Sequence, residues 1–439
     1  MALRKKRYAI VGMGGRVVMY TDALADPKQW KNCGELVGIC DTSRVRMEWH
    51  RRRLRERFGF EGELPIYKAE RFAEMVRETG AEVVIVTTPD AFHHEYAIAA
   101  MEMGCDVICE KPVTIDAGKL KALLAAVERT GRSLRVAHNM RYAPATMALK
   151  EIVASGKIGA PLNVDMQWML DTAHGADYFR RWHREKEISG GLLIHKASHH
   201  FDAVNWWVDS YPERVFCLGE LKFYGKENAE RRGERYGYSR YTGVKEAAGD
   251  PFAFFLDKRE DTKGLYLEAE KETGYIRDRN VMGEPITIED TVSISARYRN
   301  GVIFSYSLVA YCPWEGMRVA ITGTKGRAEL FQRFGTHFIT GQSQEELAAQ
   351  QEGGHMQSLR LIPMFGEAMS VEIPEAKGSH GGSDAEILAR MFDPEAKADP
   401  LKRDASHIDG AAAVLMGIAA NESIRTGLPV NCDDLCKLP

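Results

Sequence analysis

The chain has 439 residues, which is long enough for two domains with a sizeable buried core. Its 59 basic and 62 acidic residues leave a formal net charge of −3, which gives no indication of a nucleic-acid partner, and no apolar run approaches the ~20 residues of a membrane span. The eight cysteines lack the spacing of a zinc site and no apolar N-terminal segment resembles a secretory signal, so we expect reduced thiols, no bound metal, no membrane contact and a cytoplasmic protein.

Strands and helices alternate in the first part of the chain. Near-continuous apolar runs such as residues 81–87 are typical of strands buried in a parallel sheet. The expected strands cover residues 8–12, 35–41, 81–87, 106–109 and 133–137, and the expected helices cover residues 17–26, 44–58, 70–78 and 116–130. This alternation predicts an α/β fold with a doubly wound parallel sheet.

The turn after the first strand has the strand–glycine–helix context of a dinucleotide-binding fingerprint. Three glycines within Gly12–Arg16 let backbone N–H groups approach a pyrophosphate, although Val17 takes the place of the usual third glycine. Asp41, at the end of the second strand, can accept both ribose hydroxyls of NAD and would repel the 2′-phosphate of NADP. Arg44 and Arg46 lie close by and offer that phosphate a partner, so we expect NAD, with NADP as the alternative.

The second part of the chain begins at about residue 141 and has the pattern of an α+β domain. Residues 290–311 alternate apolar and polar side chains around a turn at 299–301, which predicts an antiparallel hairpin. A second pair of strands is expected over 317–322 and 327–330, further strands over 162–170 and 213–224, helices over 144–157, 384–392 and 404–426, and an exposed loop or helix over 341–358.

Residues 224–283 are charged, rich in glycine and tyrosine, and weakly periodic. We interpret them as an insertion that forms a surface loop or a subunit contact. The alternative is a lid that supplies tyrosine and arginine side chains to a polar substrate.

The stretch from residue 189 to residue 207 gathers ionisable side chains behind a pair of glycines. We expect Ser189 to cap a helix that begins at Leu192. The helix carries these side chains on two adjacent stripes, one with His195, His199 and Asp202 and the other with Lys196 and His200. This concentration of three histidines and a lysine predicts a functional site on the helix.

Five motifs follow one another in a specific order along the chain. They are Gly12–Arg16, the strand end at Asp41, Glu110-Lys111-Pro112, Asn139-Met140-Arg141-Tyr142, and Gly190-Gly191 followed by His199 and Asp202. Together they resemble the Gfo/Idh/MocA family of sugar and cyclitol oxidoreductases, and the resemblance extends from Tyr8 to about Leu428.

The resemblance implies an NAD(P)-binding Rossmann domain over residues 1–140. It implies a substrate-binding α+β domain over 141–439, with a large, mostly antiparallel sheet through which a homo-oligomer, a dimer or a tetramer, would form. The implied reaction is hydride transfer between the nicotinamide and a secondary hydroxyl of a sugar, a cyclitol or a sugar derivative.

By the same resemblance Lys111 lies beside the nicotinamide and the substrate, and His199 is the base that removes the hydroxyl proton. His195 stands where family members commonly have an aspartate and is expected to relay the proton, while Asp202 orients its neighbours. The residues expected to bind the cofactor are Gly12, Met13, Gly14, Gly15, Arg16, Asp41, Thr88, Pro89, His93, Glu110, Lys111 and Asn139. Those expected to bind the substrate are Arg141, Tyr142, Lys196, His200, Asp202 and His380.

Three other functions remain open. His380-Gly381-Gly382 resembles NAD-retaining glycoside hydrolases and lyases, which oxidise the sugar transiently, eliminate the aglycone and reduce the sugar again. A metal-dependent variant would use the i, i+4 spacing of His195 and His199, although a clear third ligand is missing. A sugar sensor without catalysis would be expected to lack the dinucleotide.

Overall fold

The computed structural model describes residues 5–26, 34–60, 62–334, 355–375, 383–393 and 395–438. They form two units, of which the first comprises Met1–Asn139, Phe255–Arg277 and Gly378–Ala411 and the second comprises Met140–Phe254, Asp278–Lys377 and Ala412–Pro439. Two segments from the later part of the chain belong to the first unit. Phe392, for example, packs edge-on against Tyr8 with ring centroids 5.1 Å apart.

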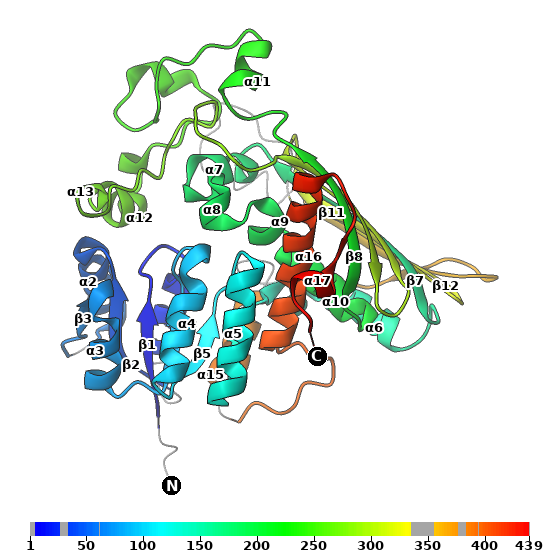
Figure 1. Ribbon diagram of the computed structural model, residues 1–439, viewed down its shortest axis with the longest axis horizontal. Helices are drawn as coiled ribbons and strands as arrows, with labels where there is room; N and C mark the ends of the chain where they lie inside the picture. Colours follow the sequence, from blue (N-terminus) through cyan, green and yellow to red (C-terminus); the bar gives the residue numbers. More distant parts are fainter. Residues whose placement is uncertain are drawn as a thin grey trace. The chain divides into compact units, whose positions relative to one another are not determined.

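A six-stranded, all-parallel sheet with the order β3-β2-β1-β4-β5-β6 forms the centre of the first unit (Figure 1). Its strands are β1 (Lys6–Val11), β2 (Gly34–Asp41), β3 (Ile66–Lys68), β4 (Val83–Val86), β5 (Asp106–Cys109) and β6 (Leu134–Val136). The sheet winds outward on both sides of β1 and β4, which confirms the predicted doubly wound fold. The carboxyl ends of β1 and β4 therefore flank the point where ligands bind in such sheets.

The helices of this unit follow local signals in the sequence. They are α1 (Val18–Ala25), α2 (Arg44–Phe58), α3 (Phe72–Thr79), α4 (His93–Glu102), α5 (Ala117–Thr130) and α15 (Ser383–Phe392). Ser43 caps α2 by accepting a hydrogen bond from the Arg46 N–H, and Asp116 caps α5 by accepting one from the Lys119 N–H. Both caps fix the point at which the chain leaves the carboxyl edge of the sheet and turns into a helix.

The second unit contains a nine-stranded sheet with the order β14-β13-β12-β11-β7-β10-β9-β8-β15. Its strands are β7 (Pro161–Asp171), β8 (Pro212–Glu220), β9 (Thr291–Tyr298), β10 (Ile303–Cys312), β11 (Gly316–Gly323), β12 (Gly326–Arg333), β13 (Met356–Pro363), β14 (Met369–Val371) and β15 (Val430–Asn431). Neighbouring strands are antiparallel except β7 and β10, which run parallel. The predicted large, mostly antiparallel sheet is thus confirmed.

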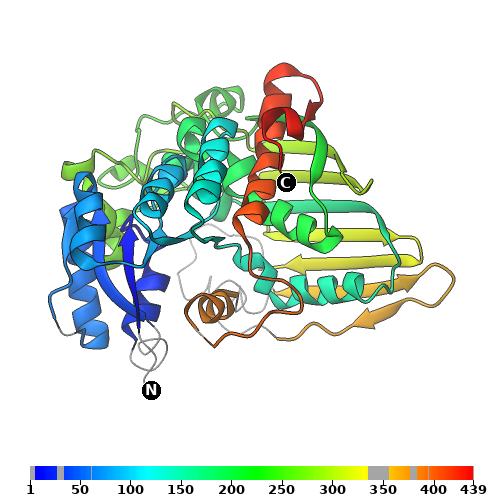
Figure 2. The same cartoon turned by 60° about the horizontal axis from the view of Figure 1, so that its bottom comes forward.

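Helices cover one face of this sheet, and Figure 2 shows α6 and α10 lying across it. The helices are α6 (Pro144–Ala154), α7 (His174–Arg180), α8 (Lys186–Ser189), α9 (Leu192–His195), α10 (Ser198–Val208), α16 (His407–Thr426, mostly in this unit) and α17 (Cys432–Leu435). Strand β9 alternates buried apolar residues, such as Val292 and Ile294, with exposed serines, Ser293 and Ser295. The serines lie on the opposite face of the sheet, which these helices do not cover.

The expected insertion is divided between the two units. Residues 224–254 belong to the second unit and contain α11 (Lys226–Arg231), whereas residues 255–277 belong to the first. The latter segment contains α12 (Glu260–Thr262), a π turn at Lys263–Leu267 and α13 (Glu270–Thr273). In the part of the chain that the structure describes, no helix combines the length and the apolar character that crossing a bilayer requires.

Candidate active site

Gly12 shapes the turn after β1. Its φ of +94° lies in the left-handed region, and a Cβ atom at this position would lie 2.6 Å from backbone atoms of Thr87 and Thr88. Glycine is therefore required for the turn to approach the end of β4 so closely. The Thr88 hydroxyl, just before Pro89, is buried and has no hydrogen-bond partner among the described residues. The backbone of the Gly12 turn and the Thr88 hydroxyl together form a surface that fits one side of a bound dinucleotide.

Asp41 ends β2 and faces the glycine turn. Its carboxylate accepts hydrogen bonds from the backbone N–H groups of Met13, at 2.6 Å, and Ser43, at 2.7 Å. These bonds place a negative charge at the carboxyl edge of the sheet, beside the turn that leads to α1. An acidic side chain at this place fits the ribose hydroxyls of NAD.

The two arginines that the sequence offers to NADP both have partners inside the unit. The Nε of Arg46 donates to the Leu265 carbonyl at 2.9 Å, and its Nη1 lies 3.7 Å from the Asp41 carboxylate. Arg44 lies 3.6 Å from Glu48, on the next turn of α2. Arg46 is thus engaged within the unit, whereas the Arg44 side chain is 68% exposed and, among the described residues, makes only this surface ion pair.

Glu110 anchors the end of β5. Its carboxylate is buried and accepts hydrogen bonds from the Nε of Arg16, at 2.6 Å, and the hydroxyl of Tyr20, at 2.8 Å. Burial alone would raise the pKa of Glu110, but the Arg16 guanidinium lowers it below its ordinary value, so the group is ionised at neutral pH. The next residue, Lys111, is thereby held at the carboxyl end of β5 with a half-buried side chain.

His93 links the loops that follow β4 and β5. Its Nδ1 lies 2.6 Å from the Pro112 carbonyl and its Nε2 lies 2.8 Å from the Thr88 carbonyl. Burial lowers the pKa of this imidazole. Both ring nitrogens thus face backbone carbonyls of these two loops, one of which belongs to the residue after Lys111. Asn139 is similarly engaged, because its amide donates to Asp384 at 2.8 Å.

The predicted helix over the histidines of the second unit is interrupted. Ser189 is not its N-cap but the last residue of α8, and its hydroxyl donates to the His183 carbonyl at 2.8 Å. Helix α9 ends at His195, and the Ala197 N–H then donates to the Leu192 carbonyl at 2.8 Å, which closes a wide turn before α10. Such wide turns are frequent at functional sites. The interruption corrects the expected continuous stripe and removes the regular spacing between His195 and His199.

His195 lies within a cluster of aromatic rings from three neighbouring elements. Its ring centroid is 4.1 Å from that of His183, 5.5 Å from that of Tyr178 and 5.7 Å from that of Trp182. Trp182 in turn stacks on His183 at 3.7 Å. Sequence reasoning missed these partners, although the run of aromatic residues over 178–183 shortly before Gly190 was a usable signal. The His195 ring meets all three partners edge-on, whereas Trp182 and His183 are stacked on each other.

Lys196 lies against the sheet rather than on a free surface. Its Nζ is 4.8 Å from the ring centroid of Trp168 on β7, and burial lowers its pKa. The nearby Glu315 carboxylate partly opposes that shift and lies 2.9 Å from the Nδ1 of His174. Lys196, His174 and Glu315 thus bring three ionisable groups together in the second unit.

Arg141 and Asp202 form a buried ion pair. The Nε and Nη2 of Arg141 donate to the two carboxylate oxygens of Asp202 at 2.7 and 2.6 Å, and the side chains are 2% and 0% exposed. The pair joins the chain before α6 to α10. The substrate contacts expected for Arg141 and Asp202 stay predictions.

His200 and Tyr142 are also enclosed. His200 stacks on Trp168 with centroids 4.0 Å apart, and its Nδ1 lies 2.7 Å from the Tyr306 hydroxyl on β10. Tyr142 is 2% exposed. His200 therefore fixes α10 to the sheet, whereas His199, its neighbour, is half-buried.

Two remaining expectations concern His380 and metal binding. His380, with Gly381 and Gly382, lies outside the described residues. The residues that the structure describes contain no group of three or more His, Cys, Asp or Glu side chains arranged to hold a metal ion.

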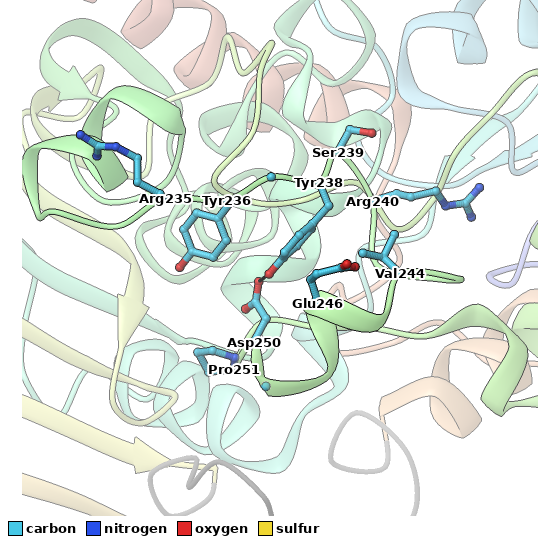
Figure 3. A pocket seen from close by; sticks show the side chains of 11 residues that line it. Arg235, Tyr236, Tyr238, Ser239, Arg240, Val244, Glu246, Asp250 and Pro251 are labelled. Atoms are coloured by element: carbon cyan, nitrogen blue, oxygen red, sulfur yellow. Dashed lines mark hydrogen bonds between the residues drawn. The ribbon is translucent and has the colours of Figure 1, made fainter.

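A cavity of about 860 Å³ lies within the second unit's part of the insertion (Figure 3). Figure 3 shows Tyr236 and Tyr238 side by side, with Asp250 next to the Tyr238 hydroxyl. That hydroxyl donates to Asp250 at 2.7 Å, while Arg240 donates to Asp278 at 2.7 Å. The first of these bonds joins two residues that line the cavity, whereas Asp278 is not among the lining residues.

The fold, the residues at the carboxyl edge of the first unit's sheet and the residues around α9 and α10 together define a class of protein. A doubly wound unit with a glycine turn, an acidic strand end and a lysine after β5, followed by an α+β unit, is the arrangement of a dinucleotide-dependent oxidoreductase. Two family models support this class. The NAD-binding Rossmann fold of an oxidoreductase family matches residues 6–138, and the C-terminal alpha/beta domain of the same family matches residues 150–432. The chain belongs to the Gfo/Idh/MocA oxidoreductase family, which confirms the resemblance seen in its motifs.

Individual relatives agree with this assignment. A Bacillus subtilis (strain 168) protein named as an oxidoreductase, YteT, is 31% identical over 417 residues, covering 92% of each chain. The inositol 2-dehydrogenase of Rubrobacter xylanophilus is 29% identical over 152 residues, which are 33% of this chain and 40% of that protein. Among solved structures, myo-inositol 2-dehydrogenase from Lactobacillus plantarum is 15% identical, with a TM-score of 0.61 over 98% of this chain and 99% of that one. At this identity the structural likeness shows the fold alone.

Proposed function

We propose that the protein is an NAD-dependent oxidoreductase that transfers hydride between the nicotinamide and a secondary hydroxyl of a sugar, a cyclitol or a sugar derivative. The observation that carries the proposal is Lys111, held after the buried Glu110 at the carboxyl end of β5 by Arg16 and His93. Relatives named inositol 2-dehydrogenase and levoglucosan dehydrogenase support this class of substrate.

In the proposed oxidation of an alcohol, Lys111, His199, His195 and Lys196 each have a different role. Bound NAD supplies the hydride acceptor. We assign to Lys111 the task of holding the hydroxyl oxygen and stabilising the charge that develops there, and to His199 the task of accepting the hydroxyl proton. His195, within its aromatic cluster, passes that proton on. Lys196 binds a further hydroxyl or a carboxylate of the substrate.

The cofactor is held by residues at the ends of three strands. We assign the pyrophosphate to the turn Gly12–Arg16 and the ribose hydroxyls to Asp41. Thr88 and Pro89 lie on the opposite side of the same edge. The engagement of Arg46 with the Leu265 carbonyl and Asp41 supports NAD over NADP.

Two further features of the proposal concern the assembly and the compartment. The chain forms a homo-oligomer through the face of the large sheet that carries Ser293 and Ser295. It works in the cytoplasm, because the seven cysteines that the structure describes are all free thiols.

The direct test is absorbance at 340 nm while the purified protein is mixed with NAD and a panel of sugars, cyclitols, uronates and glycosides. Sustained NADH formation with one class is the expected result. Release of an aglycone at constant absorbance, with NAD retained on the protein, would replace the proposal with a redox-cycling glycosidase.

Lys111→Ala tests the assigned role. It is expected to lower kcat by roughly a thousandfold while dinucleotide binding persists, since it removes a group that acts on developing charge. Lys121→Ala, which changes an exposed lysine on α5, is the matched control. Equal loss of turnover and dinucleotide binding in Lys111→Ala would show that the lysine serves the cofactor alone.

A further inference from the structure

The segment Phe255–Arg277 folds onto the carboxyl edge of the first unit's sheet. Figure 1 shows α12 and α13 beside the end of α2. The hydroxyl of Tyr266 accepts a hydrogen bond from the Gly15 N–H at 2.9 Å, and Gly264 packs so closely on Trp49 that a Cβ atom at Gly264 would lie 2.3 Å from the indole. The segment is therefore seated against both the glycine turn and α2.

Glu272 occupies the N-terminus of α2. Its Oε2 accepts hydrogen bonds from the Ser43 hydroxyl at 2.7 Å and from the Val45 N–H at 3.2 Å. The Ser43 N–H donates to Asp41, so the two carboxylates approach the same short turn from two sides. Burial alone would raise the pKa of Glu272, but the bonds from Ser43 and Val45 lower it below its ordinary value, and the group carries its charge at neutral pH.

The position matters because of where NADP differs from NAD. The ribose hydroxyls bind the acidic residue at the end of the second strand, and the 2′-phosphate of NADP extends from that ribose toward the residues that follow. Here those residues are Thr42 to Val45. The Ser43 hydroxyl and the Val45 N–H in this stretch already donate hydrogen bonds to the Glu272 carboxylate. A helix N-terminus is a favourable site for an anion, and the Glu272 carboxylate occupies the N-terminus of α2.

We infer that Glu272 is a specificity-determining residue that excludes the 2′-phosphate of NADP by occupying the N-terminus of α2. The inference rests on the proposed use of NAD as cofactor. It goes beyond the role of Asp41, because the excluding charge comes from a segment more than two hundred residues further along the chain. Arg46 and Lys68 also lie at this turn, since Lys68 donates to the Thr42 carbonyl at 2.7 Å. Removing the Glu272 charge therefore leaves the Lys68 ammonium as a cation that can attract a phosphate, while Arg46 stays engaged with Leu265 and Asp41.

The test is a binding titration in which NAD and NADP displace NADH, followed by the fluorescence of the bound NADH. Glu272→Gln keeps the length of the side chain and its ability to accept the Ser43 hydrogen bond. It is expected to lower the ratio of the Kd for NADP to the Kd for NAD at least tenfold. Glu268→Gln, an exposed acid in the same segment, removes the same charge away from α2 and is expected to leave the ratio unchanged.

Several results would overturn the inference. The first is a ratio of the Kd for NADP to the Kd for NAD that in Glu272→Gln stays within threefold of the ratio in the unmodified chain. The second is an equal change of this ratio in Glu272→Gln and Glu268→Gln. The third is an unmodified chain that binds NADP as tightly as NAD. Failure of the proposed function would look different. The displacement titration requires no sugar, so a protein that oxidises nothing in the panel but shows the tenfold change would refute the dehydrogenase proposal and support the role of Glu272.

Discussion

Replacing Asp202 by asparagine tests whether its carboxylate positions α10 or acts on substrate. The change keeps the size of the side chain and removes the charge that faces Arg141, whose guanidinium is 2% exposed. Because the pair is shielded from water, removing one partner leaves a buried charge without compensation, which costs about 3–5 kcal/mol. For a unit of this size that loss lowers the melting temperature by roughly 6–20 °C.

The assay is thermal unfolding together with kcat for the substrate that the panel identifies. Asp209→Asn, an exposed carboxylate just after the same helix, is the control and is expected to change stability by at most ~0.5 kcal/mol. The double variant Arg141→Met with Asp202→Leu removes both charges and is expected to recover most of the stability. If Asp202→Asn keeps the melting temperature of the unmodified chain and loses turnover, the carboxylate acts on the substrate and the positioning role is wrong.

Three further predictions follow from individual contacts. His93→Phe removes the imidazole that lies between the Thr88 and Pro112 carbonyls. We expect kcat to fall roughly a hundredfold as Lys111 shifts, with the Kd for NAD little changed. An unaltered kcat in steady-state assays would refute this role of His93. Burial lowers the pKa of His50 from 6.5 to about 4, so the folded state binds fewer protons than the unfolded state and loses stability as the pH falls below 6.5. The loss between pH 7 and pH 5 is about 2 kcal/mol, and urea midpoints of His50→Gln should show a smaller one; an equal loss in both chains would contradict the assignment. Ser295 and Ser305 are paired across β9 and β10 on the exposed face of the sheet. The double variant Ser295→Arg with Ser305→Arg is expected to convert the homo-oligomer into monomers, which light scattering would detect. A monomeric unmodified chain would refute that interface.

The fold follows from the sequence because its signals are local and regular. Apolar runs such as residues 83–86 indicate strands buried on both faces, and the alternation over residues 291–298 indicates a strand buried on one face. Ser43 and Asp116 start their helices where the caps stand in the sequence. Each of these features depends on neighbours within a few residues, so periodicity and capping rules suffice to predict it.

The candidate site was less accessible to sequence reasoning because it depends on distant contacts. The aromatic partners of His195 come from residues 178–183, and no spacing rule relates those residues to α9. The division of the insertion was equally hidden. Nothing periodic in residues 255–277 indicates that Tyr266 returns to the Gly15 N–H or that Glu272 reaches the start of α2.

The chemistry-bearing residues of both units lie where regular hydrogen bonding is interrupted. Asp41 is the last residue of the parallel strand β2 and Lys111 follows the parallel strand β5, while His195 and His199 flank the wide turn that separates α9 from α10. At such interruptions the backbone no longer dictates where a side chain points, so distant groups can contribute to its position. His93 lies against the Pro112 carbonyl beside Lys111, and Asp202 pairs with Arg141. The same freedom explains why helical periodicity predicted one continuous stripe through His195 and His199 where the chain forms two helices. Periodicity is informative where the backbone is regular, and the side chains proposed to be reactive lie where it is not.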